Sequence, residues 1–197
     1  MHSMTAKAFL FALYAHGEQK RKDGLPYIMH PVEVAVELAR NGADENLICA
    51  GFLHDTIEDA FITREQLTTA FNDEIAELVA EDSEDKTATW EERKTAALEA
   101  LRQPDDRSHK MLMCADKLSN MRSLREGLET DGEQVWNRFK RGREKQEWLF
   151  RETVQALAPL EGLPMYEELK QLTDEVFDSK EPEDRDELSK SGKEVFL

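Results

Sequence analysis

The spacing of apolar residues is the feature that most constrains the fold of this chain. Apolar residues recur at helical spacing almost throughout, and no stretch shows the alternating, β-branched pattern of a strand. We therefore predict an all-α fold, a bundle of about eight to nine helices. The predicted helices span residues 2–17, 31–41, 44–59, 63–70, 72–85, 90–102, 106–126, 132–158 and 165–179.

Several of the predicted helix ends carry local sequence signals. A helix commonly starts after a side chain that accepts a hydrogen bond from its first free N–H groups, and it commonly ends near Asn, Gly or Pro. These signals are Asn41-Gly42 after the second helix, Asp44 before the third, Thr63 with Gln66 as a capping box, and Pro104 after the sixth.

The length of 197 residues fits one domain, which we place at residues 1–178. Residues 179–197 are strongly charged and almost free of apolar residues until the last three. Such a segment cannot bury enough apolar surface to fold by itself. We predict that it is an acidic, disordered tail.

The formal net charge of −16 bears on the partners of the chain. A protein this acidic lacks the general basic surface that binding of bulk DNA or RNA requires. A small phosphorylated ligand is still compatible with it, because a metal ion and a local basic cluster can reverse the potential inside a cleft. We found neither a membrane-spanning stretch nor a leader peptide, so we expect a cytoplasmic protein without a membrane partner.

One loop, GEQKRKDGLPY, is basic in an otherwise acidic chain. It is a candidate site for phosphate groups. The alternative is a solvated turn, and composition alone favours the turn.

The segment LICAGFLHDTIEDAF places His54 and Asp55 side by side in an apolar helix, with Glu58 and Asp59 one turn later. Ionisable side chains are rarely buried unless they are paired or bind a metal. A metal site would account for all four. The alternative is a core histidine followed by an exposed acidic helix end.

Two further residues complete a plausible ligand set. His30 directly precedes Pro31 at the start of a predicted helix, and Asp116 interrupts an apolar helix face. Each has an ordinary alternative, as a helix-capping histidine and a surface aspartate. Together with His54 and Asp55 they form a mixed nitrogen and oxygen set that suits Mn²⁺, Fe²⁺ or Zn²⁺ with open positions for water.

The order of these residues resembles the H…HD…D motif of the HD phosphohydrolase superfamily. Three segments narrow the resemblance to the hydrolase domain of RelA/SpoT-type alarmone enzymes and to the stand-alone small alarmone hydrolases. The segments are RKDGLPYIMHPVEVAVEL, AGFLHDTIED and ADKLSNMRSL, within a likeness that covers about residues 5–155 and includes ERK at 92–94.

This resemblance implies a role for each matching residue. In the family the divalent metal is Mn²⁺, a pair of acids acts on the attacking water, and a basic pair and an amide hold the nucleotide. The implied metal ligands are His30, His54, Asp55 and Asp116; the implied catalytic acids are Glu58 and Asp59; and the implied substrate contacts are Arg21 near the base, Lys22 near phosphate, and Asn120.

The resemblance also implies a reaction, the removal of pyrophosphate from the 3′ position of ppGpp or pppGpp to leave GDP or GTP. Hydrolysis alone is expected, because no room remains for a synthetase domain. Two alternatives stay open: an HD phosphohydrolase acting on another nucleotide such as ppApp or a deoxynucleotide, and a nucleotide-binding module without turnover. The expected partner is a small phosphorylated nucleotide, and the oligomeric state stays open.

The chain departs from the family at two places. VAEDSEDKT stands where a VTD-like or VSD-like stretch is usual, and Ser119 replaces a larger residue before Asn120. We expect both departures to affect base preference, because the nucleoside pocket is built from that neighbourhood, and to leave the metal ligands untouched.

The segment VWNRFKRGREKQEWLF combines basic residues with aromatic ones. It could close over phosphates, but we favour a helix that packs its aromatic residues into the core and exposes its basic ones. His16 and His109 match no family position, and we predict that both are ordinary surface or loop residues.

Overall fold

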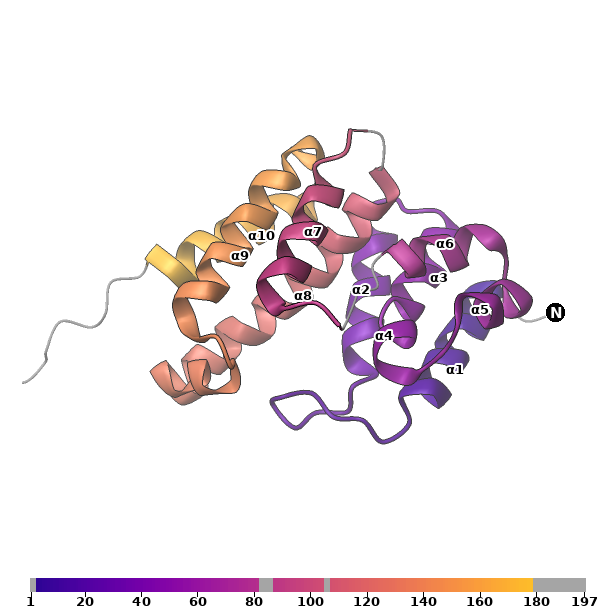
Figure 1. Cartoon of the computed structure of the whole chain (residues 1–197), viewed down its shortest axis with the longest axis horizontal. Coiled ribbons are helices and arrows are strands. Elements are labelled where there is room, and N and C mark those ends of the chain that lie inside the picture. Colours follow the sequence, from indigo (N-terminus) through magenta and orange to yellow (C-terminus); the bar gives the residue numbers. More distant parts are fainter. Residues whose placement is uncertain (1–2, 82–86, 105–106, 179–197) are drawn as a thin grey trace, which may run out of the picture.

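A computed structural model describes residues 3–81, 87–104 and 107–178 of the chain. These residues form ten α-helices and two short 3-10 helices and contain no β-strand, so the predicted all-α class is confirmed (Figure 1). The predicted tail, 179–197, and residues 82–86 of the VAEDSEDKT stretch lie outside the described residues. The elements are α1 (Met4–His16), α2 (Met29–Arg40), α3 (Glu45–Leu53), α4 (Thr56–Ala60), α5 (Arg64–Ala70), α6 (Asp73–Glu81), α7 (Trp90–Leu101), α8 (Arg107–Asp131), η1 (Gly132–Arg138), α9 (Gly142–Ala156), η2 (Ala158–Leu160) and α10 (Pro164–Asp178).

Two of the nine predicted helical segments are subdivided in the structure. The predicted helix 44–59 is split into α3 and α4, and the predicted helix 132–158 is split into η1 and α9 and reaches only the first residue of η2. Gly132 begins η1 and Gly142 begins α9, with φ angles of 57° and 69°, which glycine adopts at little cost. Helix α8 also continues to Asp131, five residues past its predicted end.

The predicted capping signals act as expected. The Asp44 side chain accepts a hydrogen bond from the Leu47 N–H at 2.9 Å, and Thr63 and Gln66 form a reciprocal capping box. Asn41 terminates α2 and Pro104 follows the end of α7. Asn41 thus marks the end of α2 and Asp44 the start of α3. Helix α2 carries the candidate ligand His30, and the candidate ligand His54 directly follows α3.

Helix α8 is the central element of the bundle (Figure 1). Helices α2, α3 and α6 pack against it on one side, and α10 packs against it on the other. Helix α9 packs in turn against α10. Leu112, Leu118 and Met121 of α8 are fully buried between these groups. A polar side chain on the same buried stretch of α8 must therefore be satisfied inside the protein.

The basic loop between α1 and α2 folds back on itself. Arg21 N–H donates to the Leu25 carbonyl and Tyr27 N–H to the Gln19 carbonyl, both at 2.9 Å, and Lys20 and Pro26 form an isolated antiparallel bridge. The turn holds Arg21 and its neighbours beside the start of α2. No described helix is both long enough and apolar enough to cross a bilayer.

Candidate metal centre and the adjoining cavities

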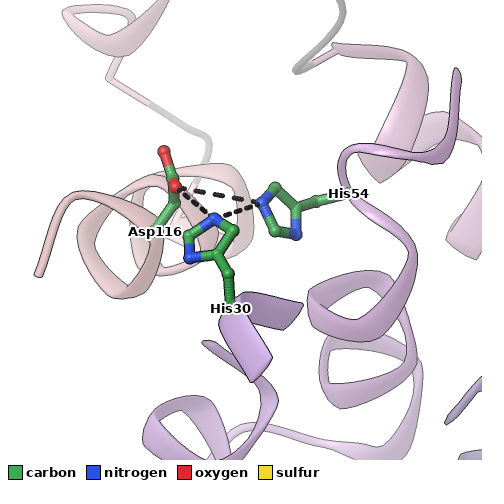
Figure 2. A group of neighbouring side chains, drawn as sticks. All are labelled: His30, His54 and Asp116. Carbon is green, nitrogen blue, oxygen red and sulfur yellow. Dashed lines mark hydrogen bonds and ion pairs between the residues drawn. The ribbon is translucent and has the colours of Figure 1, made fainter. Parts of the chain in front are cut away.

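Four side chains from two helices and one turn meet at the face of α8. His30 is the second residue of α2, His54 and Asp55 form the turn between α3 and α4, and Asp116 lies in α8. His30, His54 and Asp116 are 3%, 2% and 6% exposed. Figure 2 shows their polar ends pointing toward one another. The structure thus brings together the four residues that the sequence predicts as ligands, and we call this group, a candidate ion site, the metal centre.

The facing atoms lie within a few ångströms of one another. His30 Nε2 is 3.2 Å from His54 Nε2 and 3.1 Å from Asp116 Oδ1. Asp55 Oδ2 lies 3.0 Å from His54 Nε2 and 3.6 Å from His30 Nε2. Ligand atoms of His30, His54 and Asp116 could all reach one ion.

The outer nitrogens of the two histidines show why a cation fits between them. His54 Nδ1 lies 2.9 Å from the Gly51 carbonyl oxygen, which only accepts, so this nitrogen carries the hydrogen. His30 Nδ1 lies 2.9 Å from Ser119 Oγ. With hydrogens on both Nδ1 atoms, the Nε2 atoms of the two rings are the ones that face each other and the two carboxylates, and an Nε2 atom without a hydrogen can bind a metal ion. A divalent cation is the partner that such a set of nitrogen and oxygen acceptors shares.

The two carboxylates of the centre are held in their ionised form. Burial raises the pKa of Asp116, but Lys117, whose Nζ lies 2.7 Å from Asp116 Oδ2, and the two histidines outweigh burial and hold that pKa well below its ordinary value. Burial likewise opposes ionisation of Asp55, and His54 and His30 lower its pKa in spite of it. Both carboxylates are therefore available as metal ligands near neutral pH.

The helix predicted over 44–59 is interrupted at the two residues that carry the motif. The Gly51 carbonyl accepts from His54 Nδ1 and the Leu53 carbonyl accepts from Thr56 Oγ1 at 2.6 Å. In a continuous helix these carbonyls would accept the backbone N–H groups four residues ahead. Side-chain hydrogen bonds thus accompany the break, and the turn presents His54 and Asp55 from a helix end.

The predicted catalytic acids, Glu58 and Asp59, lie on α4 beside the centre. Asp59 N–H still donates to the Asp55 carbonyl at 2.8 Å, so one helical turn survives across the break. Tyr27 Oη lies 2.5 Å from Asp55 Oδ2 and 3.4 Å from Asp59 Oδ2. Tyr27 was not predicted from the sequence, although it stands three residues before His30 in the matched motif. Burial, followed by Asp55, raises the Tyr27 pKa above its ordinary value, so the phenol stays a hydrogen-bond donor.

Two cavities adjoin the metal centre. The large cavity, of about 410 Å³, lies toward η1 and α9, and the small cavity, of about 200 Å³, lies toward α4 and α7. Glu58 lines the small cavity and Asp59 lines both. The two cavities therefore meet at the centre. The residues that line both are Tyr27, His30, Asp59, Lys94, Lys117 and Asn120.

The three predicted substrate contacts all line the large cavity. Lys22 Nζ lies 4.3 Å from the centroid of the Phe139 ring. Partial burial, followed by repulsion from Lys140 and Lys94, lowers the Lys22 pKa. Asn120 Nδ2 donates to Asp116 Oδ1 at 2.7 Å, which links the cavity wall directly to a candidate ligand.

Three further cations of this wall, Lys94, Lys117 and Arg138, were not predicted as site residues. Lys94 belongs to the matched ERK segment and Lys117 directly follows Asp116, so both had a sequence signal that was not used. Arg138 had a weaker one. It lies in the basic aromatic segment, for which we favoured core packing.

The structure of the basic aromatic segment agrees in part with each of its two interpretations. Trp136 and Phe150 are buried at 8% and 5% exposure, as the favoured interpretation predicts. Phe139 and Arg138 instead line the large cavity, and Arg141 pairs with Glu91 of α7 at 3.4 Å. The expectation that all its basic residues are merely solvated is wrong.

Two other expectations are also wrong. His16 and His109 are 5% and 6% exposed rather than surface or loop residues. His16 packs its ring against Tyr27, with centroids 4.7 Å apart, and His109 lies in the first turn of α8 and lines the small cavity. Ser119, expected to affect only the nucleoside pocket, contacts the candidate ligand His30.

Known proteins place this arrangement in a family. The model of the HD domain family matches residues 8–146, a range that includes every residue of the metal centre. The crystal structure of lmo0812 from Listeria monocytogenes EGD-e is 37% identical, covers 76% of this chain and 99% of its own, and superposes with a TM-score of 0.72. A metazoan ortholog of SpoT, 23% identical, covers 90% of this chain and 97% of its own with a TM-score of 0.73, which shows the shared fold.

Curated bacterial proteins are similar over most of the chain. A Synechocystis protein named "Probable guanosine-3′,5′-bis(diphosphate) 3′-pyrophosphohydrolase" is 37% identical over 166 residues, which are 81% of this chain and 20% of that protein. A Brucella ovis protein named "GTP pyrophosphokinase rsh" is 35% identical over 175 residues, 84% of this chain and 22% of that protein. The chain thus spans about a fifth of the length of these relatives. They confirm the resemblance seen in the three motifs, and with the match over residues 8–146 they establish that the chain belongs to the HD domain family.

Proposed function

We propose that this protein is a metal-dependent phosphohydrolase that removes pyrophosphate from the 3′ position of ppGpp or pppGpp and leaves GDP or GTP. The observation that carries the proposal is the convergence of two histidines and two ionised carboxylates at the edge of a cation-lined cavity. The Synechocystis relative, whose printed name gives this activity, supports the choice of substrate.

The metal ligands in this proposal are His30, His54, Asp55 and Asp116. A set of two imidazoles and two carboxylates suits several first-row divalent ions, and we propose Mn²⁺ from the family resemblance. When bound, the ion supplies Lewis acidity, which polarises a phosphoryl oxygen and lowers the pKa of coordinated water from about 15.7 to as little as about 7. The protein contributes the fixed orientation of the four ligands, through the Gly51 carbonyl, Lys117 and the other hydrogen bonds described above.

The proposed acid and base are Glu58 and Asp59. Both line the small cavity beside the centre, and Asp59 also reaches the large one. One carboxylate accepts a proton from the attacking water while the other assists proton transfer to the leaving group, a contribution typically worth about 10²–10⁴ in rate. Tyr27 donates its single hydroxyl hydrogen to Asp55 Oδ2, the nearer acceptor, and so orients this ligand beside Asp59, whose Oδ2 lies 3.4 Å from the same hydroxyl.

The large cavity is the proposed nucleotide site. We place the base near Arg21, a phosphate group near Lys22, and the nucleoside near Asn120. The cavity wall carries five basic and two acidic residues in a chain whose net charge is −16, so basic residues outnumber acidic ones where a polyanionic ligand would bind. The basic residues are Arg21, Lys22, Lys94, Lys117 and Arg138.

A panel of nucleotides tests the proposal against its alternatives. Purified protein with Mn²⁺ is incubated with ppGpp, ppApp, GTP and dGTP, and the products are separated by ion-exchange chromatography. Release of pyrophosphate and GDP from ppGpp, with little turnover of the others, is the expected result. Turnover of ppApp or dGTP alone would keep the phosphohydrolase and discard the substrate. Tight binding of ppGpp without pyrophosphate release would contradict the enzyme and favour a binding module.

A further inference from the structure

The outer nitrogens of the two candidate histidine ligands are held in different ways. The Nδ1 of His54 bonds to the Gly51 carbonyl, a backbone group three residues earlier in α3. The Nδ1 of His30 instead bonds to Ser119 Oγ, a side chain of α8 that is 89 residues away in sequence. Ser119 is 2% exposed, so this hydroxyl has no access to bulk water in which to find another partner.

A second hydrogen bond extends from Ser119 to α2. Ser119 Oγ lies 2.5 Å from Glu33 Oε2, and Glu33 lies one helical turn after His30. The carboxylate of Glu33 accepts only, so the single hydroxyl hydrogen of Ser119 goes to Glu33. The serine oxygen must then accept from His30 Nδ1–H. The direction of both bonds is thus determined by the carboxylate at the end of the chain.

We propose that Ser119 and Glu33 form a positioning relay for His30, which fixes its hydrogen on Nδ1 and directs the Nε2 lone pair at the metal. Hydrogen bonding of the outer N–H of a metal-bound histidine fixes the tautomer and ring orientation and makes the ligand nitrogen more basic. The negative charge of Glu33 strengthens its hydrogen bond from Ser119, which makes the serine oxygen a better acceptor for His30 Nδ1–H. The inference rests on the proposed function in so far as it takes the metal centre to bind a divalent ion.

The relay changes what position 119 is expected to do. Ser119 is not among the residues that line the large cavity, whereas its neighbour Asn120 is. Replacement of Ser119 is therefore expected to act on metal affinity before it acts on base preference. Ser119 contacts a candidate ligand without lining the large cavity, whereas Asn120 lines that cavity and also bonds to Asp116.

Isothermal titration of the full-length protein with Mn²⁺ measures the effect. Loss of an outer hydrogen-bond partner typically costs about 10- to 100-fold in metal affinity, so Ser119→Ala is expected to weaken Mn²⁺ binding by that factor. Glu33→Gln is expected to weaken it less, because glutamine still offers an oxygen to the hydroxyl. The double variant is expected to match Ser119→Ala, because partners in one network are not additive.

Ser108→Ala and Glu126→Gln are matched controls. Both residues are exposed on α8, and the changes remove the same chemical groups away from the centre. Wild-type Mn²⁺ affinity in Ser119→Ala, or equal losses in the two controls, would overturn the relay.

A spectroscopic measurement tests the relay without metal. Long-range ¹H–¹⁵N correlation spectra of the metal-free protein at mildly alkaline pH distinguish the two neutral tautomers of His30. The relay predicts the Nδ1–H form in the wild type and a mixture in Ser119→Ala; the Nε2–H form in the wild type would overturn it. The proposed function fails separately, if wild-type protein in which the relay is confirmed hydrolyses no nucleotide. The relay fails separately, if ppGpp is hydrolysed while His30 shows the Nε2–H form.

Discussion

The metal centre and the large cavity adjoin each other but are built from different kinds of structure. Three of the four candidate ligands, His30, His54 and Asp116, are buried, and a backbone carbonyl or a buried hydroxyl holds the outer nitrogen of each histidine. The wall of the large cavity is assembled from the loop before α2, from α7 and α8, and from η1 and α9. Its basic residues are half-buried or exposed.

This difference predicts a division of labour. Rigid, buried acceptors suit a small ion that requires fixed coordination, whereas long basic side chains on several elements suit a flexible polyanion. Changes in the centre should therefore remove metal and turnover together. Changes at wall residues that do not contact the centre, such as Lys22, should alter substrate affinity and leave metal binding as it was.

The largest effect is expected from Asp116→Asn. The substitution removes one anionic ligand and leaves the Lys117 ammonium beside an amide, so Mn²⁺ binding and turnover should both fall to background. Calorimetric titration measures the first and pyrophosphate release the second. Asp174→Asn, an exposed change on α10, is the control, and retained Mn²⁺ binding by Asp116→Asn would show that the centre is not the ion site.

Glu58→Gln should separate chemistry from ion binding. The amide cannot accept a proton as the carboxylate does, so we expect kcat to fall by about 10²–10⁴ while Mn²⁺ affinity stays close to that of the wild type. Steady-state kinetics and metal titration are run on the same preparation, with Glu126→Gln beside it. An unchanged kcat with Mn²⁺ bound would remove Glu58 from the acid and base roles.

Lys22→Ala probes the cavity side of the comparison. A hydrogen bond to a charged group contributes about 1.5–3 kcal/mol, so KM for ppGpp should rise by about 10- to 100-fold while Mn²⁺ affinity is unchanged. Lys170→Ala, exposed on α10, is the control. Weakened Mn²⁺ binding in Lys22→Ala would show that the two regions are not separable.

The pH dependence of KM sharpens the same test. Because partial burial and then Lys140 and Lys94 lower the Lys22 pKa, Lys22 loses its proton at a lower pH than an ordinary lysine does. The charged form binds phosphate, so KM of the wild type should rise on the alkaline side before ordinary lysines titrate. The rise should be absent in Lys22→Ala. A rise of the same size in the variant would assign it to another group.

The smallest effect is expected where packing positions the centre. A Cβ on Gly51 would lie 2.7 Å from Leu38 Cδ1 and 3.2 Å from Ala35 Cα, so Gly51→Ala must push α3 away from α2. Overpacking of this kind costs about 1–3 kcal/mol in the free energy of unfolding, measurable by urea denaturation. Mn²⁺ affinity should weaken too, because His30 lies in α2 and His54 directly follows α3, so movement of α3 changes the distance between them. Unchanged values of both would show that the centre tolerates movement of α3.

The helical class and the clustering of the four candidate ligands were accessible from the sequence because each has a local signal. Periodic apolar residues predict helices, and His30, the His54-Asp55 pair and Asp116 interrupt apolar faces in a fixed order. The break after Leu53 was not accessible, since it accompanies hydrogen bonds from the His54 and Thr56 side chains that compete with a locally favourable helix.

Only part of the wall of the large cavity could be predicted from the sequence, for a physical reason. Arg21 and Lys22 stand together in one basic loop, but Arg138 reaches the same cavity from η1, more than a hundred residues later, through packing that no local pattern encodes. The burial of His16 is similar, because it depends on the loop that brings Tyr27 against its ring. Contacts between distant segments are the part of the site that the sequence left undetermined.

Anomalous diffraction at the manganese edge from crystals grown with Mn²⁺ tests the central claim most directly. The account predicts a strong peak bounded by His30 Nε2, His54 Nε2 and one oxygen each from Asp55 and Asp116. A strong peak elsewhere in the molecule, with these four side chains clear of it, would contradict the claim that they form the metal centre.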